Sequence, residues 1–416
     1  MQLDSKRSFS NTYTIFTNYT CNLNCTYCFE HNKMNLVNDT ASIKNFIQYA
    51  YKHDMEETNY NKDQVLKFYL IGGEPLLVPN IISCICDEAY SLQKKYHLNH
   101  NFKVYITTNG TLINTPEIKK LFKKYKDYIK IGVSIDGNKE SNDKYRVDYN
   151  GMGSWDRGVE GIKIALDILG TNLSKVSCKS TYTHDNIPLW SEGVISLLKL
   201  GVNWINANYV TEEIWTDEDT PILADQFFTV TDYLFNNNLY DSARVMQCNK
   251  YPNRFMVNYD VTYIQNKSTS LCKTPLYPKC LGFDNKIYPC HRFITENDDK
   301  YALGILKDNE IVITNDLLQK NIHCIYENLP DKCITCKLRS ECYRCSEYLF
   351  QKNIDNPSKV LKETLPPMCG WVTAEVASRY YFKRRLRVEL GIPEDSPDNI
   401  KLIKNKSEVN SNSLNT

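Results

Sequence analysis

Short apolar, β-branched and aromatic runs alternate with longer amphipathic segments through the first half of the chain. The runs lie at residues 13–19, 65–71, 102–108, 129–135, 176–182 and 202–207. The segments between them, such as DTASIKNFIQYAYKH and GVEGIKIALDIL, repeat apolar residues at helical spacing. Strands that alternate with helices predict a parallel sheet with helices outside it, so the expected fold class is α/β. Six units without a clear seventh predict a partial (β/α)6 barrel rather than a closed barrel of eight.

The pattern changes beyond about residue 220. Residues 221–262 look mainly helical and aromatic-rich, and from Cys272 to Cys369 the periodicity weakens while cysteines dominate. Metal ligation can replace a hydrophobic core in such a segment. The predicted division is a barrel at 13–220, a helical bridge at 221–271, a small cysteine-rich domain at 272–372, a C-terminal helix at 373–403 and a disordered polar tail at 404–416.

Composition narrows the class of protein. The 416 residues include 50 Lys plus Arg and 49 Asp plus Glu, and this net charge of +1 provides no general attraction for nucleic acid or acidic lipid. No apolar run approaches the roughly 18 residues that a membrane span needs. The first residues, MQLDSKRSFSN, contain no apolar core of a secretory signal. We therefore expect a cytoplasmic protein with no nucleic-acid partner and no membrane partner.

The unusual feature is the number and grouping of the cysteines. Of 16 cysteines, three fall within residues 21–28 and nine within residues 272–369. Without a secretory signal a disulfide framework is not expected, and grouped intracellular cysteines are more often metal ligands or catalytic groups. The chain is therefore predicted to carry two metal-bearing regions, separated by an ordinary folded stretch.

The first group is Cys21, Cys25 and Cys28, with the spacing C-x3-C-x2-C. Three thiolates in one short loop can hold three irons of a [4Fe–4S] cluster and leave the fourth iron open. An open coordination position is typical of a reactive metal centre. The alternatives are a zinc loop or buried thiols, but structural zinc sites prefer four protein ligands.

This segment resembles the signature C-x3-C-x-aromatic-C of the radical S-adenosylmethionine (SAM) superfamily, with Tyr27 at the aromatic position. The resemblance implies a TIM-like partial barrel and one [4Fe–4S] cluster whose open iron binds SAM. It also implies reductive cleavage of SAM to a 5′-deoxyadenosyl radical, which abstracts hydrogen from a substrate. An external one-electron reductant of the flavodoxin or ferredoxin type would supply the electron.

Other segments resemble the parts of that family that surround SAM. Gly72-Gly73-Glu74-Pro75 follows a predicted strand, where glycines allow close backbone approach and Glu74 can accept a hydrogen bond from the SAM ammonium group. Arg146 resembles the arginine that pairs with the SAM carboxylate. The resemblance assigns cofactor binding to Tyr27, Gly72, Gly73, Glu74, Asn109, Ser134, Asp136 and Arg146. Taken singly, the glycine segment can be a plain turn and Arg146 a surface residue.

The second cysteine group resembles the SPASM extension of radical SAM enzymes, which carries two auxiliary [4Fe–4S] clusters. The resemblance assigns two ligand sets: Cys272, Cys280, Cys290 and Cys345 for one cluster, and Cys333, Cys336, Cys342 and Cys369 for the other. Asn285 stands where the family pattern has glycine, and Asn tolerates the left-handed conformation of a turn. The gap before Cys345 is also one residue shorter than the pattern. Cys324 is left over and can replace Cys280 or be a free thiol, and zinc ligation is the alternative for the whole group.

The radical SAM/SPASM layout, from about residue 13 to 372, implies a peptide or protein substrate. One interpretation is a maturase that forms a thioether or other crosslink in a ribosomally made peptide. The alternative is an anaerobic sulfatase-maturating enzyme, which converts Cys or Ser to formylglycine. Those maturases carry an Asp base after the cysteine that matches Cys290, whereas this chain has His291. A histidine can act as a base or as a structural residue beside a cluster, and the difference favours peptide maturation.

Two further expectations concern partners and class. Only about twelve residues precede the first predicted strand, so leader recognition would fall to the barrel and SPASM surfaces or to a separate leader-binding protein. A different class is a non-catalytic iron–sulfur electron carrier or a zinc-binding interaction protein. An electron carrier needs neither the GGEP segment nor Arg146, and a zinc interaction protein needs no barrel.

Overall fold

The structure is a computed structural model. It describes residues 11–30, 33–57, 65–97, 102–172, 175–210, 213–249, 279–294, 299–327 and 368–391, together with residues 333, 335–338, 341–342 and 345. The account below concerns these residues.

Seven parallel strands form the body of the fold, and consecutive strands pair in chain order. They are β1 (Thr12–Phe16), β2 (Lys67–Ile71), β3 (Lys103–Thr108), β4 (Ile129–Ser134), β5 (Val176–Tyr182), β6 (Trp204–Tyr209) and β7 (Arg244–Val245). The six strands expected from the sequence are confirmed. The seventh is two residues long, too short for a periodic signal, and lies inside the segment predicted as a helical bridge.

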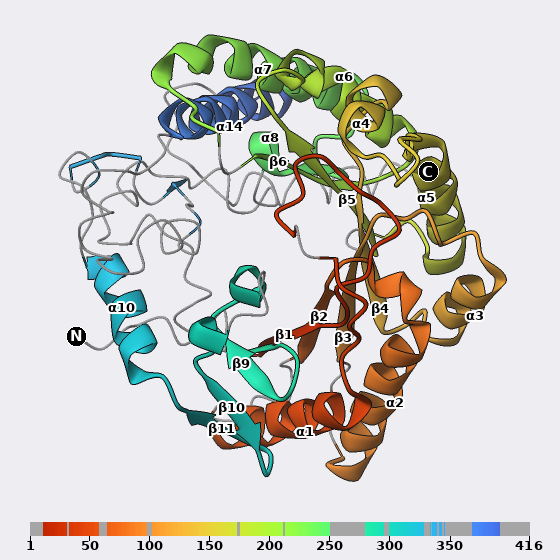
Figure 1. Ribbon diagram of the computed structural model, residues 1–416. Helices are drawn as coiled ribbons and strands as arrows, with labels where there is room; N and C mark the ends of the chain where they lie inside the picture. The colour runs from red at the N-terminus through yellow and green to blue at the C-terminus, as the bar shows by residue number, and fades with distance from the viewer. Residues whose placement is uncertain are drawn as a thin grey trace.

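Helices cover the outer side of this curved sheet (Figure 1). They are α1 (Thr40–Glu57), α2 (Pro79–Lys95), α3 (Pro116–Lys124), α4 (Lys139–Tyr145), α5 (Trp155–Leu169), α6 (Trp190–Lys199) and α7 (Thr220–Asn236). The short helix α8 (Met246–Asn249) follows β7 and lies inside this ring of helices. Pro79 and Pro116 open α2 and α3 at a position where the missing N–H is not needed. Gly170 ends α5 with a φ of 91°, a conformation that glycine adopts without strain.

The cysteine-rich part continues the same sheet beyond β1. Strand β8 (Cys280–Leu281) pairs parallel to β1, and β9 (Lys286–Tyr288), β10 (Gly304–Lys307) and β11 (Glu310–Ile313) follow antiparallel. The sheet is therefore open, with eleven strands and with β7 and β11 at its edges. Asp284 and Asn285 turn the chain between β8 and β9 with φ values of 54° and 59°, which confirms the left-handed turn expected at Asn285.

Two helices complete the described fold. Helix α10 (Asp316–Glu327) follows β11, and α14 (Cys369–Glu389) lies beside α7 (Figure 1). The C-terminal helix was expected to begin at residue 373, but Cys369, Gly370, Trp371 and Val372 already belong to α14. The extra turn forms because Trp371 and Val372 are buried. None of the helices in the described part of the chain is long and apolar enough to cross a membrane.

Strand alternation separates an apolar core from a polar interior. In β3 to β6, residues such as Val104, Val133, Cys178 and Ile205 are buried in the main core. Their neighbours along each strand are less buried and point to the other face, as the two-residue period of a strand requires. A second apolar cluster, which includes Phe16, Tyr19, Phe283 and Phe293, joins the end of β1 to the β8–β9 region.

Trp371 is the aromatic centre where α14 meets the barrel. Its ring lies 5.1 Å from that of Tyr209, 5.3 Å from Trp215 and 5.5 Å from Phe227, and it is 1% exposed. Trp371→Ala should lower the free energy of unfolding by about 3–5 kcal/mol, because it leaves a cavity among these rings. Val388→Ala on the same helix, at a side chain that is 73% exposed, should change it by about 0.5 kcal/mol or less. Denaturant unfolding measures both, and equal effects would contradict this packing.

Candidate active site

A cavity of about 720 Å³ opens at the carboxyl ends of the barrel strands. The loop after β1 lines one side of it, and the ends of β3 to β6 line another. The turn at His291 and Arg292 and the first turns of α14 close the remaining sides. Cavities of this size hold small molecules and cofactors, and this edge of a parallel barrel is where such sites form.

The loop that carries Cys21, Cys25 and Cys28 is held on two sides. On one side, the Gly73 N–H donates to the Asn18 carbonyl at 2.7 Å and the Glu74 N–H donates to the Thr20 carbonyl at 2.8 Å. On the other side, the Asn24 N–H donates to the Val147 carbonyl at 2.7 Å, and the Thr26 N–H donates to the Tyr145 carbonyl at 3.0 Å. All three thiols are half-buried, belong to no disulfide and line the cavity. The three cysteines predicted as cluster ligands are thus brought to one site.

The environment of Cys21 and Cys25 favours the neutral form of their thiols. Burial, reinforced by the negative charge of Glu74, raises the pKa of Cys21 to about 11. Burial also raises the pKa of Cys25, against the opposing effect of Arg146. Thiolates in such a site are stabilised by bound metal charge, since the coordinating thiol loses its proton. Within the described residues, no group of three or more Cys, His, Asp or Glu side chains has the arrangement of a site for one metal ion.

Gly72 and Gly73 are required by the approach of the cysteine loop. A Cβ atom on Gly72 would lie 2.4 Å from the Asn18 oxygen, and one on Gly73 would lie 2.3 Å from the oxygens of Tyr19 and Thr20. Both glycines also line the cavity. The close backbone approach expected at these glycines is therefore between the turn after β2 and the loop after β1. Contact of the two glycines with SAM stays a prediction.

The Glu74 carboxylate is buried and accepts hydrogen bonds from neighbouring groups of the protein. It is 1% exposed and accepts hydrogen bonds from Leu76 N–H at 3.0 Å, Thr108 Oγ1 at 2.7 Å and Asn109 N–H at 2.7 Å. Burial raises its pKa, and these donors act in the opposite direction. Glu74 thereby ties the turn after β2 to the end of β3, and the predicted contact with the SAM ammonium group stays a prediction.

Asn109 and Ser134 lie at the strand ends where the sequence placed them, and both line the cavity. The side-chain Nδ2 of Asn109 donates to Asn22 Oδ1 at 2.8 Å and lies 3.9 Å from Cys21 Sγ. The side-chain Oδ1 of Asn109 accepts from the Thr111 N–H at 3.0 Å. Asn109 therefore connects the end of β3 to the cysteine loop.

Asp136, Arg146 and Tyr27 form one buried polar group. The Asp136 side chain is fully buried, pairs with Arg146 Nε at 3.1 Å and accepts a hydrogen bond from the Tyr27 hydroxyl. Burial opposes the charge of Arg146, but Asp136 and Tyr27 outweigh it, so the pKa of the guanidinium is raised. The guanidinium also stacks 5.6 Å from the Tyr27 ring centre and reaches within 3.9 Å of Cys25 Sγ. Arg146 and Tyr27 line the cavity. Asp136 is not among the lining residues and binds both of these side chains on the side away from the cavity.

The opposite walls contain residues that the sequence analysis did not single out. Besides Ser134, alternate residues of the strands face the cavity: Thr107, Lys179, Thr181, Asn206 and Asn208. Beyond them, Trp371 Nε1 donates to Glu375 Oε1 at 2.8 Å, and Arg379 lies 3.5 Å from Glu375 and 2.9 Å from Glu341. The two-residue period within each predicted strand was the signal that could have found the strand residues.

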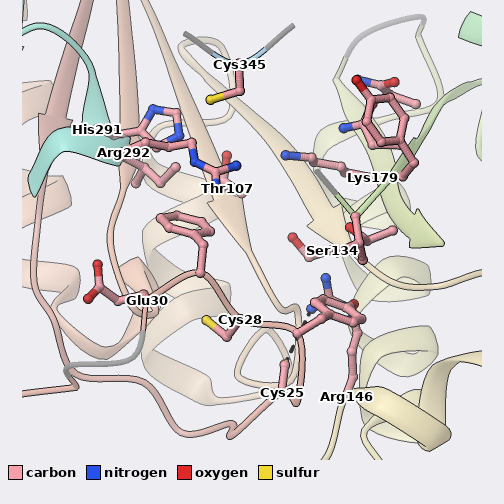
Figure 2. A pocket seen from close by; sticks show the side chains of 18 of the residues that line it. Cys25, Cys28, Glu30, Thr107, Ser134, Arg146, Lys179, His291, Arg292 and Cys345 are labelled. Carbon is pink, nitrogen blue, oxygen red and sulfur yellow. Dashed lines mark hydrogen bonds between the residues drawn. The ribbon is translucent and has the colours of Figure 1, made fainter. Parts of the chain in front are cut away.

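His291 lies on the cavity wall beside Arg292, and Lys179 lies across the cavity from it (Figure 2). Burial, followed by the charges of Lys179 and Arg292, lowers its pKa to about 3. The imidazole is therefore neutral at ordinary pH and binds a proton weakly. The predicted role of His291 as a base stays a prediction.

The cysteines assigned to auxiliary clusters are only partly described. Cys280, Cys290 and Cys333 are buried in one apolar cluster, whereas Cys342 lies in another with Met368 and Val372. Cys336 is exposed, Cys345 lines the cavity and Cys369 opens α14. Cys272 and the side chain of Cys324 lie outside the described residues. Cys333 is thus grouped with Cys280 and Cys290 rather than with Cys342, and the ligand sets stay predictions.

Comparisons with known proteins agree with this geometry. Residues 15–182 match the family model of the radical SAM superfamily. A serine-type anaerobic sulfatase-maturating enzyme of Klebsiella pneumoniae is 31% identical over 336 residues, covering 77% of this chain and 78% of the relative. Protein MJ0907 of Methanocaldococcus jannaschii is 36% identical over 190 residues, and there the match spans 45% of this chain and only 58% of the relative.

Solved structures share the fold. The structure of anSMEcpe with bound AdoMet has a TM-score of 0.64 at 15% identity, covering 90% of this chain and 97% of that one. Streptococcus suis SuiB bound to the precursor peptide SuiA has a TM-score of 0.56 at 17% identity, covering 86% and 75%. The fold and site therefore define a radical enzyme built on a partial barrel. The chain belongs to the radical SAM superfamily, within the SPASM-type group that includes the anaerobic sulfatase-maturating enzymes.

The cofactors of this superfamily are SAM and a [4Fe–4S] cluster, and the residues present fit them. Three half-buried thiols share one cavity, with side-chain donors 3.9 Å from two of the sulfur atoms. Cys21, Cys25 and Cys28 would hold the cluster, and Arg146, Asn109 and Ser134 offer polar groups to SAM in the same cavity. When bound, the pair supplies a 5′-deoxyadenosyl radical for hydrogen abstraction.

The glycine contacts generate a prediction. Gly73→Ala should displace the loop that carries Cys21, since its Cβ would overlap two carbonyl oxygens, and should lower both stability, by about 1–3 kcal/mol, and iron content after anaerobic reconstitution. Gly132→Ala is the matched control, because its Cβ would meet only the Ser177 hydroxyl at 3.4 Å. Iron analysis and denaturant unfolding measure the difference. Equal iron content in the two variants would contradict the proposed constraint.

The buried ion pair generates a second prediction. Arg146→Met should destabilise the fold by about 3–5 kcal/mol, because it leaves the Asp136 carboxylate buried without its cation. Adding Asp136→Asn should recover part of that stability but not SAM affinity, if Arg146 itself contacts SAM. Unfolding and equilibrium SAM binding separate the two effects. Recovery of SAM affinity in the double variant would reduce Arg146 to a structural role.

Proposed function

We propose that this protein is a radical SAM enzyme that modifies a residue of a peptide or protein. The observation that carries the proposal is the single cavity shared by the three thiols of the cysteine loop, the polar strand ends and the cysteine-rich segment at His291 and Cys345. A substrate side chain in that cavity would lie beside the cofactors and would be enclosed by Trp371, Met368 and Tyr209. Membership of the superfamily argues against the non-catalytic electron carrier and the zinc interaction protein.

A peptide or protein substrate is supported by the relatives. Sulfatase-maturating enzymes are named for a protein substrate, and SuiB is seen with a precursor peptide. In this chain the residues that would bind the cofactors come from the barrel, whereas Trp371 and Glu375 come from α14 and Met368 caps that helix. The walls away from the cysteine loop therefore offer a separate surface for a substrate segment. An external flavodoxin or ferredoxin type of donor would supply the electron, and a separate leader-binding protein would be consistent with the proposal.

Within this class we favour crosslink formation in a ribosomally made peptide, as a thioether or another bond. Formylglycine formation needs a base for the substrate Cys or Ser, and the residue at the expected position is His291. Protonating His291 would place a cation near Lys179 and Arg292, which is why its pKa falls to about 3. What favours crosslink formation is the residue type itself, since the sulfatase maturases carry Asp where this chain has His291.

Sulfatase maturation is the second candidate. It is supported by the Klebsiella pneumoniae relative, which is 31% identical over 78% of its length. Two auxiliary [4Fe–4S] clusters in the cysteine-rich part would suit either reaction, since closed clusters carry electrons.

The first test concerns radical chemistry. The anaerobically reconstituted protein, given reductant and SAM, should release 5′-deoxyadenosine. Replacing Cys21, Cys25 and Cys28 together by Ala should abolish this release, while Cys84→Ala, at a half-buried thiol on α2, should leave it unchanged. Liquid chromatography of the nucleoside products measures both. Undiminished release of 5′-deoxyadenosine by the triple variant would contradict the proposal.

The second test separates the two reactions. The protein is given a sulfatase-derived peptide carrying Cys or Ser and, separately, short Cys- or Tyr-rich peptides encoded beside its gene. We expect a neighbouring peptide to lose two hydrogens and to resist backbone fragmentation between the joined residues, as a crosslink requires. A hydrazide-reactive aldehyde in the sulfatase peptide alone would instead establish the sulfatase-maturating activity.

A further inference from the structure

Glu375 is a carboxylate of α14 that lines the cavity and has one oxygen fixed by hydrogen bonds. Trp371 Nε1 donates to Glu375 Oε1 at 2.8 Å, and Gln247 Nε2 donates to the same oxygen at 3.3 Å. Gln247 is itself held, because its Oε1 accepts from the Ala207 N–H at 3.3 Å. Three elements, β6, α8 and α14, therefore fix the orientation of the Glu375 side chain.

The second oxygen of Glu375, Oε2, is held less closely. It lies 3.5 Å from Arg379 Nη2, and this contact is an ion pair rather than a hydrogen bond, since Nη2 has no hydrogen-bond partner among the described residues. Arg379 makes its shorter contact, of 2.9 Å, with Glu341. The Glu375 side chain is 18% exposed, whereas that of Arg379 is 4% exposed and is not among the lining residues. Oε2 of Glu375 is therefore able to accept a hydrogen bond from a ligand in the cavity.

Glu375 is also the most accessible carboxylate of the cavity. Among the described residues, the other two that line it are Glu30 and Glu341. Glu30 is 3% exposed and Glu341 is 9% exposed, whereas Glu375 is half-buried. A ligand that needs a carboxylate partner would therefore meet it at Glu375.

The cations that line the cavity are placed around the cysteine loop rather than beside α14. Lys33 donates to a carbonyl of that loop at 2.7 Å, Arg146 lies 3.9 Å from one of its thiols, and Arg292 stacks 5.0 Å from the aromatic ring that follows it. Burial, with the charges of Arg146 and Arg292, lowers the pKa of Lys179, so Lys179 lies near these two cations. A positively charged ligand at Glu375 would therefore lie at the α14 wall, apart from the cysteine loop.

Apolar side chains lie beside Glu375 on the same wall. Tyr209 and Met246 are half-buried and line the cavity. The Tyr209 ring lies 5.1 Å from that of Trp371, and Met246 directly precedes Gln247, so both are next to a donor to Glu375. An aromatic ring attracts a cation, and apolar surface packs against the methylene stem of Lys or Arg. The wall therefore offers apolar surface for a stem and a carboxylate for the charged end.

We infer that Glu375 binds a positively charged group of the peptide substrate, an ammonium or guanidinium group close to the modified residue. A carboxylate that is oriented at one oxygen and open at the other forms charge-assisted hydrogen bonds to such a group. The attraction is stronger in a poorly hydrated cavity than in water. Glu375 is thus a specificity-determining residue: it selects a substrate with a Lys or Arg side chain, or a free N-terminus, near the modified residue.

The inference rests on the proposed function, because it assumes that the cavity receives a peptide. It uses a residue of α14, whereas the residues expected to bind SAM come from the barrel and the cysteine loop. SAM carries an ammonium group and a sulfonium charge of its own. The experiment must therefore separate a positive group of the substrate from those of SAM, and SAM is kept bound while the substrate probe is added.

The test measures the dissociation constants of four probes by saturation-transfer NMR on the full-length, anaerobically reconstituted protein with SAM bound. N-acetyl-lysine amide and N-acetyl-arginine amide carry side-chain cations, alanine amide carries a free α-amine, and N-acetyl-norleucine amide is the neutral control. The parent protein is compared with Glu375→Gln and with Glu389→Gln. Glu389 is exposed on the same helix and serves as the matched control.

A second measurement locates the binding site in the parent protein, without a substitution. An aryl diazo compound esterifies accessible carboxyl groups, and mass spectrometry of the digest quantifies the ester at Glu375 and, in the same sample, at Glu389. The rates are recorded without SAM, with SAM, and with SAM and each probe. A probe bound at Glu375 should protect that carboxylate alone.

Glu375→Gln should raise the dissociation constants of the cationic probes by about tenfold, as expected for loss of one charge-assisted hydrogen bond, and Glu389→Gln should change them by less than about twofold. A cationic probe at ten times its dissociation constant should slow esterification of Glu375 by about tenfold and leave Glu389 unaffected. The most tightly bound of the cationic probes identifies the source as a side chain or an N-terminus.

Three results would overturn the inference: equal affinity for the neutral and the cationic probes, cationic probes that bind without protecting Glu375, or protection of Glu375 by SAM before any probe is added. The last result would assign Glu375 to the cofactor. Release of 5′-deoxyadenosine is recorded on the same preparations, because its absence would contradict the proposed function, whereas the binding and esterification results judge Glu375 by itself.

Discussion

The site depends on the contact between two backbone segments, the turn after β2 and the loop after β1. Gly72 and Gly73 lie so close to Asn18, Tyr19 and Thr20 that no side chain fits between them, and two backbone hydrogen bonds of 2.7 and 2.8 Å hold the segments together. The loop held in this way carries Cys21, Cys25 and Cys28. Glu74 extends the constraint to β3 through its hydrogen bonds to Thr108 and Asn109. The positions of the thiols are therefore fixed by the barrel as well as by their spacing.

Charge is distributed around the cavity in separate groups. Asp136 holds Arg146 beside Cys25 from behind, and Arg379 holds Glu341 and Glu375 at the far wall. Both groups are largely buried, so each charge needs its partner, and each pair keeps a polar side chain in a defined place.

The sequence predicted the parts of the fold with strong local signals. The six longer parallel strands have β-branched and aromatic runs, and the cysteine spacing and the GGEP turn are dense motifs. Strands β7 and β8 are two residues long and carry no periodicity, so neither the seventh barrel strand nor the continuation of the sheet past β1 was predictable. The partners of Glu74 and the cavity wall from α14 arise from contacts between distant segments.

The central claim is that SAM binds at a cluster held by Cys21, Cys25 and Cys28. Electron paramagnetic resonance of the reduced, reconstituted protein tests it directly, because ligation of an iron by SAM changes the spectrum of that cluster alone. The account predicts that SAM shifts the g-values of one reduced [4Fe–4S] signal and that this signal is missing when the three cysteines are replaced by Ala. A spectrum unchanged by SAM, or a SAM-sensitive signal that survives in the triple variant, would contradict the account.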